Sequence, residues 1–243
     1  MWWSSLFTDM RPSDFFNFSF LPKYGVAFVR GIEYTLLLAV VSVLLAVIPA
    51  LLLALMRLSK VKPVKWLSGA YIAVFRSTPM LVQLSIIYFG LFYAISLPRV
   101  SLFGFVDISR FIPGVVALAL NSSAYVAEIF RAGILAVDKG QTEAARSLGL
   151  SGWQSMRLVV LPQAIKNVLP ALANELVTMV KESSICSMLG MAEIMYTAQT
   201  VSGNSYITLA PYVLAALVYF CINYPASKAI EAIERRMRRG DKQ

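Results

Sequence analysis

Three polar side chains recur at helical spacing inside a long apolar stretch near the middle of the chain. Asn121, Tyr125 and Glu128 are separated by four and three residues, which puts them on one face of a helix. A charged group at the centre of a bilayer costs about 2.5–3.5 kcal/mol, so such groups usually face the bundle interior or a wet cavity. The stripe offers hydrogen-bond acceptors to a polar solute.

A second polar run, from Arg76 to Pro79, interrupts another apolar stretch. Proline breaks the hydrogen-bond ladder of a helix, so backbone groups become free beside the hydroxyls of Ser77 and Thr78. Such donors suit a carboxylate. The resulting hypothesis is that one solute is approached by five side chains: Ser77, Thr78, Asn121, Tyr125 and Glu128.

The same charges also have a structural interpretation, in which they form a network that holds helices together. Arg76 can pair with Glu128 or Glu175 across the bundle. For Glu128 the two interpretations stay equally open, whereas for Arg76 and Arg131 the network is favoured.

A third group of charges lies between residues 166 and 191. Glu175 and Glu182 are seven residues apart and therefore share one helix face. Together with Lys181 they are candidates to flank a solute pathway. Pairing among these charges at a helix interface is the favoured alternative.

The elements that must position these groups are membrane-spanning helices. Of the 243 residues, 58% are hydrophobic, against roughly 45–50% in soluble domains, and the mean hydropathy is +0.68. A span needs roughly 20 mostly apolar residues. The sequence therefore predicts an all-α membrane protein with five transmembrane helices, near residues 34–55, 66–97, 111–136, 166–191 and 207–227.

The net charge of +9 is explained by topology rather than by nucleic-acid binding, because Lys and Arg cluster in the segments between apolar runs. Alternate connections hold 15 of these residues on one side and five on the other. Since Lys and Arg are retained in the cytoplasm, this bias predicts an N-terminus outside and a C-terminus inside.

The chain divides into three parts in this interpretation. Residues 1–25 form an interfacial segment, residues 26–232 the transmembrane domain, and residues 233–243 a basic tail suited to lipid headgroups. There is no histidine, and Cys186 and Cys221 lie apart in apolar stretches. We therefore expect no metal site, no disulfide and no histidine-based catalysis.

The long polar connection at 137–165 faces the cytoplasm in this topology, where a soluble partner can reach it. Residues 142–149 predict a short helix that stops at Gly149, because glycine readily adopts the left-handed conformation at a helix end. A second helical stretch at 152–160 follows. The expected shape is a helix, a turn and a helix.

The chain at this point resembles the binding-protein-dependent ABC permeases. Their cytoplasmic signature is EAA, three residues, G, nine residues, I, one residue, LP. Here it is matched by Glu143-Ala144-Ala145, Gly149, Val159 in place of Ile, and Leu161-Pro162. The runs 76–83 and 121–133 resemble the polar amino acid branch of the family, and the whole resemblance covers roughly residues 25–230.

The resemblance implies a fold like that of type I ABC importer permeases, with a cytoplasmic coupling helix that docks in a cleft of an ATPase subunit. The residues that take this role are Glu143, Ala144, Ala145, Ser147, Leu148, Gly149 and Leu150.

The resemblance also implies the partners and the place in the cell. Two ABC ATPase subunits, a second permease subunit and an extracytoplasmic amino-acid-binding protein are expected, in the cytoplasmic (inner) membrane of a bacterium. The second permease is either identical or different. The chain has no Gly-x-x-x-x-Gly-Lys-Ser/Thr loop, so it is expected not to be an enzyme, and ATP and Mg belong to the ATPase.

The function expected from the resemblance is ATP-driven import of polar amino acids. The alternatives are a secondary transporter or channel for small polar solutes, and an intramembrane enzyme that uses Lys181 with Ser183 or Ser184. The candidate substrate-binding residues are Ser77, Thr78, Gln83, Asn121, Ser122, Tyr125, Glu128, Glu175 and Lys181.

Overall fold

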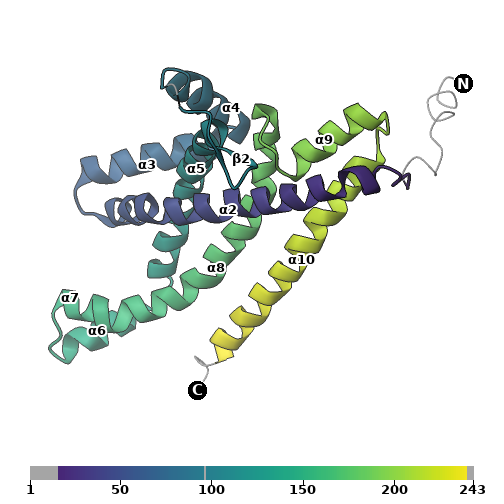
Figure 1. Cartoon of the computed structure of the whole chain (residues 1–243). Helices are drawn as coiled ribbons and strands as arrows, with labels where there is room; N and C mark the ends of the chain where they lie inside the picture. Colours follow the sequence, from purple (N-terminus) through teal and green to yellow (C-terminus); the bar gives the residue numbers. More distant parts are fainter. Residues whose placement is uncertain (1–15, 96, 240–243) are drawn as a thin grey trace, which may run out of the picture.

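The computed structural model describes residues 16–95 and 97–239 and is mostly helical. Figure 1 shows α2 crossing the whole molecule, with α3 folded back beside its C-terminal half. The elements in chain order are α2 (Leu21–Leu58), α3 (Lys62–Ser77), α4 (Met80–Ser85), η2 (Ile86–Phe92), β1 (Ser101–Leu102), β2 (Val106–Asp107), α5 (Ile108–Leu135), α6 (Lys139–Ser147), α7 (Gly152–Ser155), η3 (Met156–Val160), α8 (Leu161–Glu182), η4 (Ser183–Leu189), α9 (Ile194–Ser205) and α10 (Ala210–Arg239).

Helices α2 and α5 form the centre of the bundle because both present small residues where they meet. Ala50 and Ala54 of α2 pack in one cluster with Ala124 and Ala127 of α5, and all four are fully buried. Small residues let helix backbones approach closely inside a membrane. A second cluster extends toward α8 and includes Tyr34, Leu38, Leu84, Leu118 and Met179.

The predicted span 66–97 is broken in the middle. Thr78 and Pro79 are extended, with ψ of 144° and 137°, because the residue before a proline is pushed out of the helical region. The helices on the two sides, Lys62–Ser77 and Met80–Phe92, are bent by 106° relative to each other. This segment is therefore a broken span or a re-entrant loop.

Five spans were predicted, and the described residues give fewer by length and composition. Three helices are long and apolar enough, α2, α5 and residues 210–237 of α10, or four if the bent pair is one span. The predicted fourth span corresponds to α8, which is too polar to qualify because it carries Lys166, Glu175, Lys181 and Glu182. The five-span count therefore stays a prediction.

Two of the three predicted parts of the chain, the interfacial segment and the tail, lie only partly within the described residues. The first fifteen residues of the interfacial segment 1–25 and the last four of the tail 233–243 lie outside the described residues. In the described part, α2 begins at Leu21, well before the apolar run, and α10 continues without interruption into the tail.

The helix, turn and helix predicted for 137–165 is confirmed. Helix α6 begins at Lys139, where Asp138 accepts a hydrogen bond from the Gly140 N–H at 2.7 Å. It ends as expected at Gly149, whose φ of +86° is left-handed. The second stretch comprises α7 and η3, and Ser151 opens it with a capping box.

A buried carboxylate starts α9 at the other end of the bundle. Glu193 is fully buried and accepts hydrogen bonds from the Met195 N–H at 2.9 Å and the Tyr196 N–H at 2.6 Å. The Tyr219 hydroxyl donates to the same carboxylate at 2.7 Å. Glu193 thus joins α9 to α10 through neutral donors alone.

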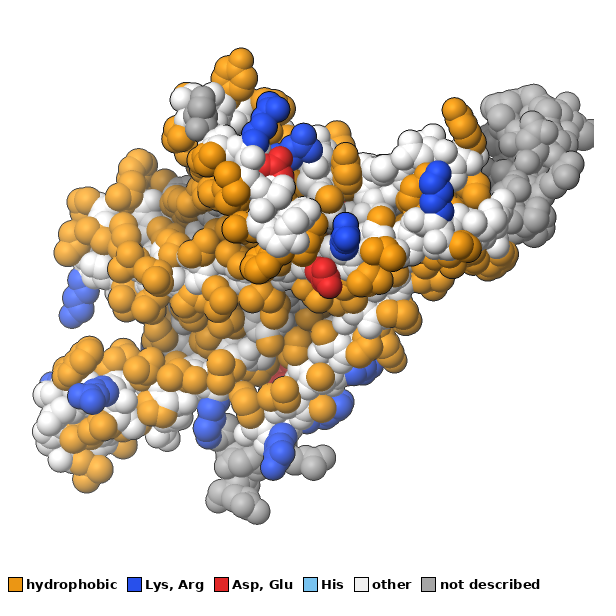
Figure 2. Space-filling model, in the orientation of Figure 1, with side chains coloured by type: hydrophobic (Ala, Val, Ile, Leu, Met, Phe, Trp, Pro, Cys, Tyr) orange, Lys and Arg blue, Asp and Glu red, His pale blue; other side chains and the backbone are white. Residues whose placement is uncertain are grey.

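The surface separates apolar from basic regions. Figure 2 shows hydrophobic side chains over most of the middle of the molecule, while Lys and Arg side chains lie toward the end that carries α6, α7 and the C-terminal end of α10 and also on the opposite side, above α2. This distribution fits a helical protein whose middle lies in hydrocarbon.

Candidate functional site

A cavity of about 380 Å³ lies at the break between α3 and α4. Three separate helical regions contribute to its wall: the break itself, the middle of α5, and the C-terminal end of α8 with η4. We call it the break cavity; its lining residues are Thr78, Pro79, Met80, Leu81, Asn121, Tyr125, Glu175, Thr178, Met179, Glu182 and Ile185.

Gln83 holds the break in shape from behind the cavity. Its amide nitrogen donates to the carbonyl oxygens of Phe75 at 2.8 Å and Thr78 at 3.0 Å, and to the Thr78 hydroxyl at 2.7 Å. These carbonyls lost their helical partners at the break, so the side chain replaces the missing ladder. Asn121 then donates to the Gln83 amide oxygen at 2.8 Å, which fixes α5 against the break.

Glu175 brings a carboxylate to the opposite wall. The Ser122 hydroxyl donates to one of its oxygens at 2.8 Å. Among the described residues, the ion pairs within 4 Å do not include Glu175 or Glu182. The cavity therefore has two acidic side chains in its wall and no basic one, so it suits a group that carries positive charge.

Tyr125 lies between the break cavity and a neighbouring one. The second cavity, of about 460 Å³, is lined by Arg57, Arg76, Ser77, Tyr125 and Glu128, among others. The guanidinium carbon of Arg76 stands 5.3 Å from the centre of the Tyr125 ring, within range of a cation–π contact. We call this second space the adjoining cavity.

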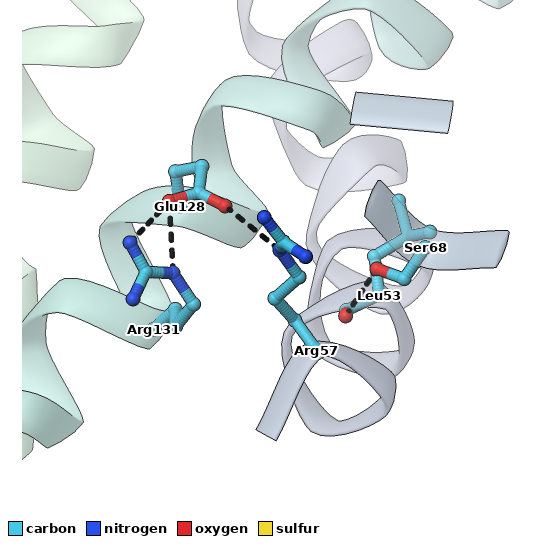
Figure 3. Close-up of polar contacts among 5 residues, drawn as sticks. All are labelled: Leu53, Arg57, Ser68, Glu128 and Arg131. Carbon is cyan, nitrogen blue, oxygen red and sulfur yellow. Dashed lines mark hydrogen bonds and ion pairs between the residues drawn. The ribbon is translucent and has the colours of Figure 1, made fainter. Parts of the chain in front are cut away.

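Glu128 is held by two arginines. Figure 3 shows its carboxylate between Arg131, on the same helix, and Arg57 of α2. The Nη2 atom of Arg131 is 2.8 Å away and its Nε–H donates at 2.9 Å, while the Nε atom of Arg57 is 3.9 Å away. This arrangement favours the network interpretation of Glu128, although with Arg57 and Arg131 in place of Arg76.

The structure thus sorts the predicted substrate-binding residues into three groups. Thr78, Asn121, Tyr125 and Glu175 line the break cavity. Ser77 and Glu128 line the adjoining cavity, and Gln83 and Ser122 lie behind the break cavity as hydrogen-bond partners of its wall. Lys181 is exposed and belongs to neither lining.

Several wall residues were outside the predicted set. Thr178 and Met179 follow Glu175 at three and four residues, so the helical period from Glu175 could have found them. Glu182, which the sequence placed on the same face as Glu175 as a candidate to flank a pathway, also lines the wall. Met80 and Leu81 carried no such signal, because they are ordinary apolar residues that become wall only through the break.

The predicted coupling residues form a compact hairpin at the end of the bundle. Glu143, Ala144, Ser147 and Leu148 are exposed, and Leu148 is 85% exposed. Ala145 is buried instead, because it is the side of α6 that packs inward. Trp153 on α7, which is 70% exposed, adds a second large apolar side chain to this end.

The described residues contain no group of three or more Cys, Asp and Glu side chains that could hold a metal ion.

Curated relatives of the chain are permeases of amino acid transport systems. The chain is 41% identical over 213 residues to the arginine transport system permease protein ArtQ of Bacillus subtilis, covering 88% of this chain and 93% of the relative. It is 40% identical over 218 residues to the putative glutamine transport system permease protein GlnP of Rickettsia typhi, covering 90% and 95%.

Solved structures similar to the chain are also ABC transporters. A crystal structure of an amino acid ABC transporter with histidines matches with a TM-score of 0.82 and 45% identity, over 90% of this chain and 98% of that chain. The MetNI methionine ABC transporter, in an inward-facing conformation, shares the fold at a TM-score of 0.65 and 21% identity, over 85% and 96%.

The family model for the binding-protein-dependent transport system inner membrane component matches residues 42–239. That range includes the break, the stripe on α5, and the hairpin of α6 and α7. The chain therefore belongs to the family of binding-protein-dependent transport system inner membrane components, the membrane-spanning permeases of ABC importers.

Proposed function

We propose that the chain is the permease subunit through which an ATP-driven importer moves polar amino acids, received from an extracytoplasmic binding protein. The names of the curated relatives, which are permeases for arginine and glutamine, support this substrate class. The observation that carries the proposal is the break cavity, where one helix break and two acidic side chains face the same space.

The break cavity has groups for both ends of an amino acid. Glu175 and Glu182 accept hydrogen bonds from the ammonium group. The carboxylate is met at the first turn of α4, which has no side-chain cap. There the N–H groups of Met80 and Leu81 precede the first hydrogen bonds of the helix, which run from the Val82 and Gln83 N–H groups to the Pro79 carbonyl. Tyr125 and Asn121 close the wall between the two ends.

Energy reaches the site from other subunits in this proposal. Two ATPase subunits, which bind ATP and Mg, dock on residues 143–150, and a second permease subunit, identical or different, completes the pathway. The N-terminus lies outside the bacterial cytoplasmic membrane and the C-terminus inside, as the charge bias indicates. The exposure of Leu148 and Trp153 supports docking at this end.

The test is the ATPase activity of the complex in nanodiscs, with its binding protein loaded in turn with each common amino acid. We expect one or a few polar amino acids to stimulate hydrolysis. Asn121→Ala should lower that stimulation severalfold, whereas the matched control Glu33→Gln, an exposed site on α2, should not. Equal stimulation by all amino acids, or equal effects of both variants, would contradict the proposed site.

The same assay tests the docking surface. Leu148→Glu should abolish stimulation because it places a charge in the contact with the ATPase. Val61→Glu is the control, since Val61 is an exposed apolar residue in the turn between α2 and α3. Normal stimulation of the Leu148 variant would show that residues 143–150 do not form the contact with the ATPase.

A further inference from the structure

A third cavity lies where α2 ends, α3 begins and α5 ends, next to the adjoining cavity, with which it shares Arg57. It has a volume of about 320 Å³ and is lined by three basic side chains, two leucines and no acidic side chain: Arg57, Leu58, Lys65, Arg131 and Leu135. We call it the basic cavity. Its chemistry is that of an anion site.

The charges at this cavity do not balance. Glu128 contacts both Arg57 and Arg131, so a single carboxylate faces two guanidinium groups, as Figure 3 shows. Lys65 adds a third positive charge to the wall. The cluster of these four side chains therefore carries a net charge of +2. Like charges held close together repel, and a bound anion offsets that repulsion.

The surroundings of the cavity match the boundary between hydrocarbon and water. Trp66 lies next to Lys65 in the chain and is 73% exposed, and exposed tryptophans mark the headgroup level of a membrane protein. Leu58 and Leu135 line the cavity and Leu135 is 59% exposed, so the edge of the cavity is apolar. A ligand that is anionic at one end and apolar at the other fits both parts.

We propose that the basic cavity binds the phosphate group of an anionic phospholipid, with Arg57, Lys65 and Arg131 as its ligands and the acyl chains along Leu58 and Leu135. Basic pockets between transmembrane helices bind anionic headgroups in this way. Arginine suits the contact because its planar fork matches phosphate oxygens. A free phosphate ion has the same chemistry, but it makes no use of the apolar edge.

The test is native mass spectrometry of the full-length permease, purified in detergent and supplied with phosphatidylglycerol or phosphatidylcholine. We expect selective retention of phosphatidylglycerol. Lys65→Gln should weaken it about fivefold, which is the effect of one basic side chain near an anionic headgroup. Lys65 is exposed, so this variant folds normally. Lys62→Gln is the matched control, because Lys62 lies in the first turn of the same helix, α3, but outside the cavity lining.

The outcomes separate the two sources of phosphate. Retention that falls in the Lys65 variant and not in the Lys62 variant supports the lipid site. Binding of inorganic phosphate that depends on Lys65, without selective retention of phosphatidylglycerol, assigns the same anion site to free phosphate. Equal retention of both lipids with no phosphate binding, or equal losses in both variants, overturns the proposal.

Discussion

Two regions of the bundle handle acidic side chains in opposite ways. In the ion-pair region near the α2–α3 turn, Glu128 is surrounded by Arg57 and Arg131. In the break cavity, Glu175 receives one hydrogen bond from Ser122 and is in no ion pair among the described residues. A carboxylate whose charge is already compensated can brace helices, whereas one left without a cation can take a cation from outside.

The neutral network around Gln83 belongs to the second region and is the basis of its shape. Ion pairs at partly exposed positions contribute little, with a median of about 0–1 kcal/mol. Hydrogen bonds that satisfy buried backbone groups are costlier to remove. The comparison therefore predicts that the uncharged Gln83 contributes more to the stability of the bundle than the ion pairs of Glu128 with Arg57 and Arg131 do.

The largest effect is expected for Gln83→Met, which keeps the volume but removes four hydrogen bonds to Phe75, Thr78 and Asn121. Leaving these buried groups without partners should lower the free energy of unfolding by roughly 3 kcal/mol or more. Thermal unfolding of the purified permease measures this change. Gln163→Met is the control, because Gln163 is only partly buried; equal losses in both variants would remove the special role of the break.

Glu193 extends the comparison to a fully buried carboxylate with neutral partners only. Burial raises its pKa from 4.5 to about 7, while the bonds from Met195, Tyr219 and Tyr196 oppose the shift. Because the folded pKa is above the unfolded one, ionising Glu193 costs more in the folded state than in the unfolded state. The free energy of unfolding is therefore highest below about pH 4.5 and falls as the pH rises through 7. The loss should amount to about 3 kcal/mol.

Thermal unfolding between pH 5 and pH 9 measures the effect of Glu193. The variant Glu193→Gln should flatten the pH profile, since an amide does not titrate, although it keeps only one of the two acceptor oxygens. A profile as steep in the variant as in the parent protein would assign the pH dependence to other groups.

The next effect is that of Glu175→Gln on transport. The amide oxygen still accepts from Ser122, so folding should be preserved. Loss of the negative charge should reduce uptake in proteoliposomes about tenfold, because a charge-assisted hydrogen bond to the ammonium group becomes a neutral one. Full uptake in a folded variant would show that the carboxylate has no part in binding the solute.

The smallest effect is expected for Glu128→Gln. Its ion pairs are 20–37% exposed at their side chains, so their removal should cost less than about 1 kcal/mol of stability. Uptake should stay within about twofold of the parent. A tenfold loss of uptake with unchanged stability would show that Glu128 takes part in substrate binding rather than in holding helices together.

Local patterns in the sequence predicted those features that depend on neighbouring residues. Proline and the residue before it indicated the break at Thr78 and Pro79, and glycine indicated the end of α6 at Gly149. The four-and-three spacing put Asn121 and Tyr125 on one face, and both line the break cavity. These results rest on backbone sterics and helical period, which act within a few residues.

Features that depend on distant contacts were not predicted. The sequence pattern suggested Arg76 as the partner of Glu128, but Arg57 approaches from α2, and Arg76 stacks on Tyr125 instead. The role of Gln83 required knowledge of the 106° bend, which brings its side chain back onto carbonyls at the break. No pattern in the sequence contains that angle.

The large apolar side chains on α6 and α7 have a consequence for how such a subunit is made. Leu148 and Trp153 stand out from the end of the bundle, and hydrocarbon cannot cover them if that end reaches into water. In the proposed complex the ATPase covers these side chains, so a newly inserted permease without its ATPase exposes an apolar surface of the kind that chaperones and proteases recognise. The proposed docking on this hairpin would therefore favour matched synthesis of the permease and its ATPase.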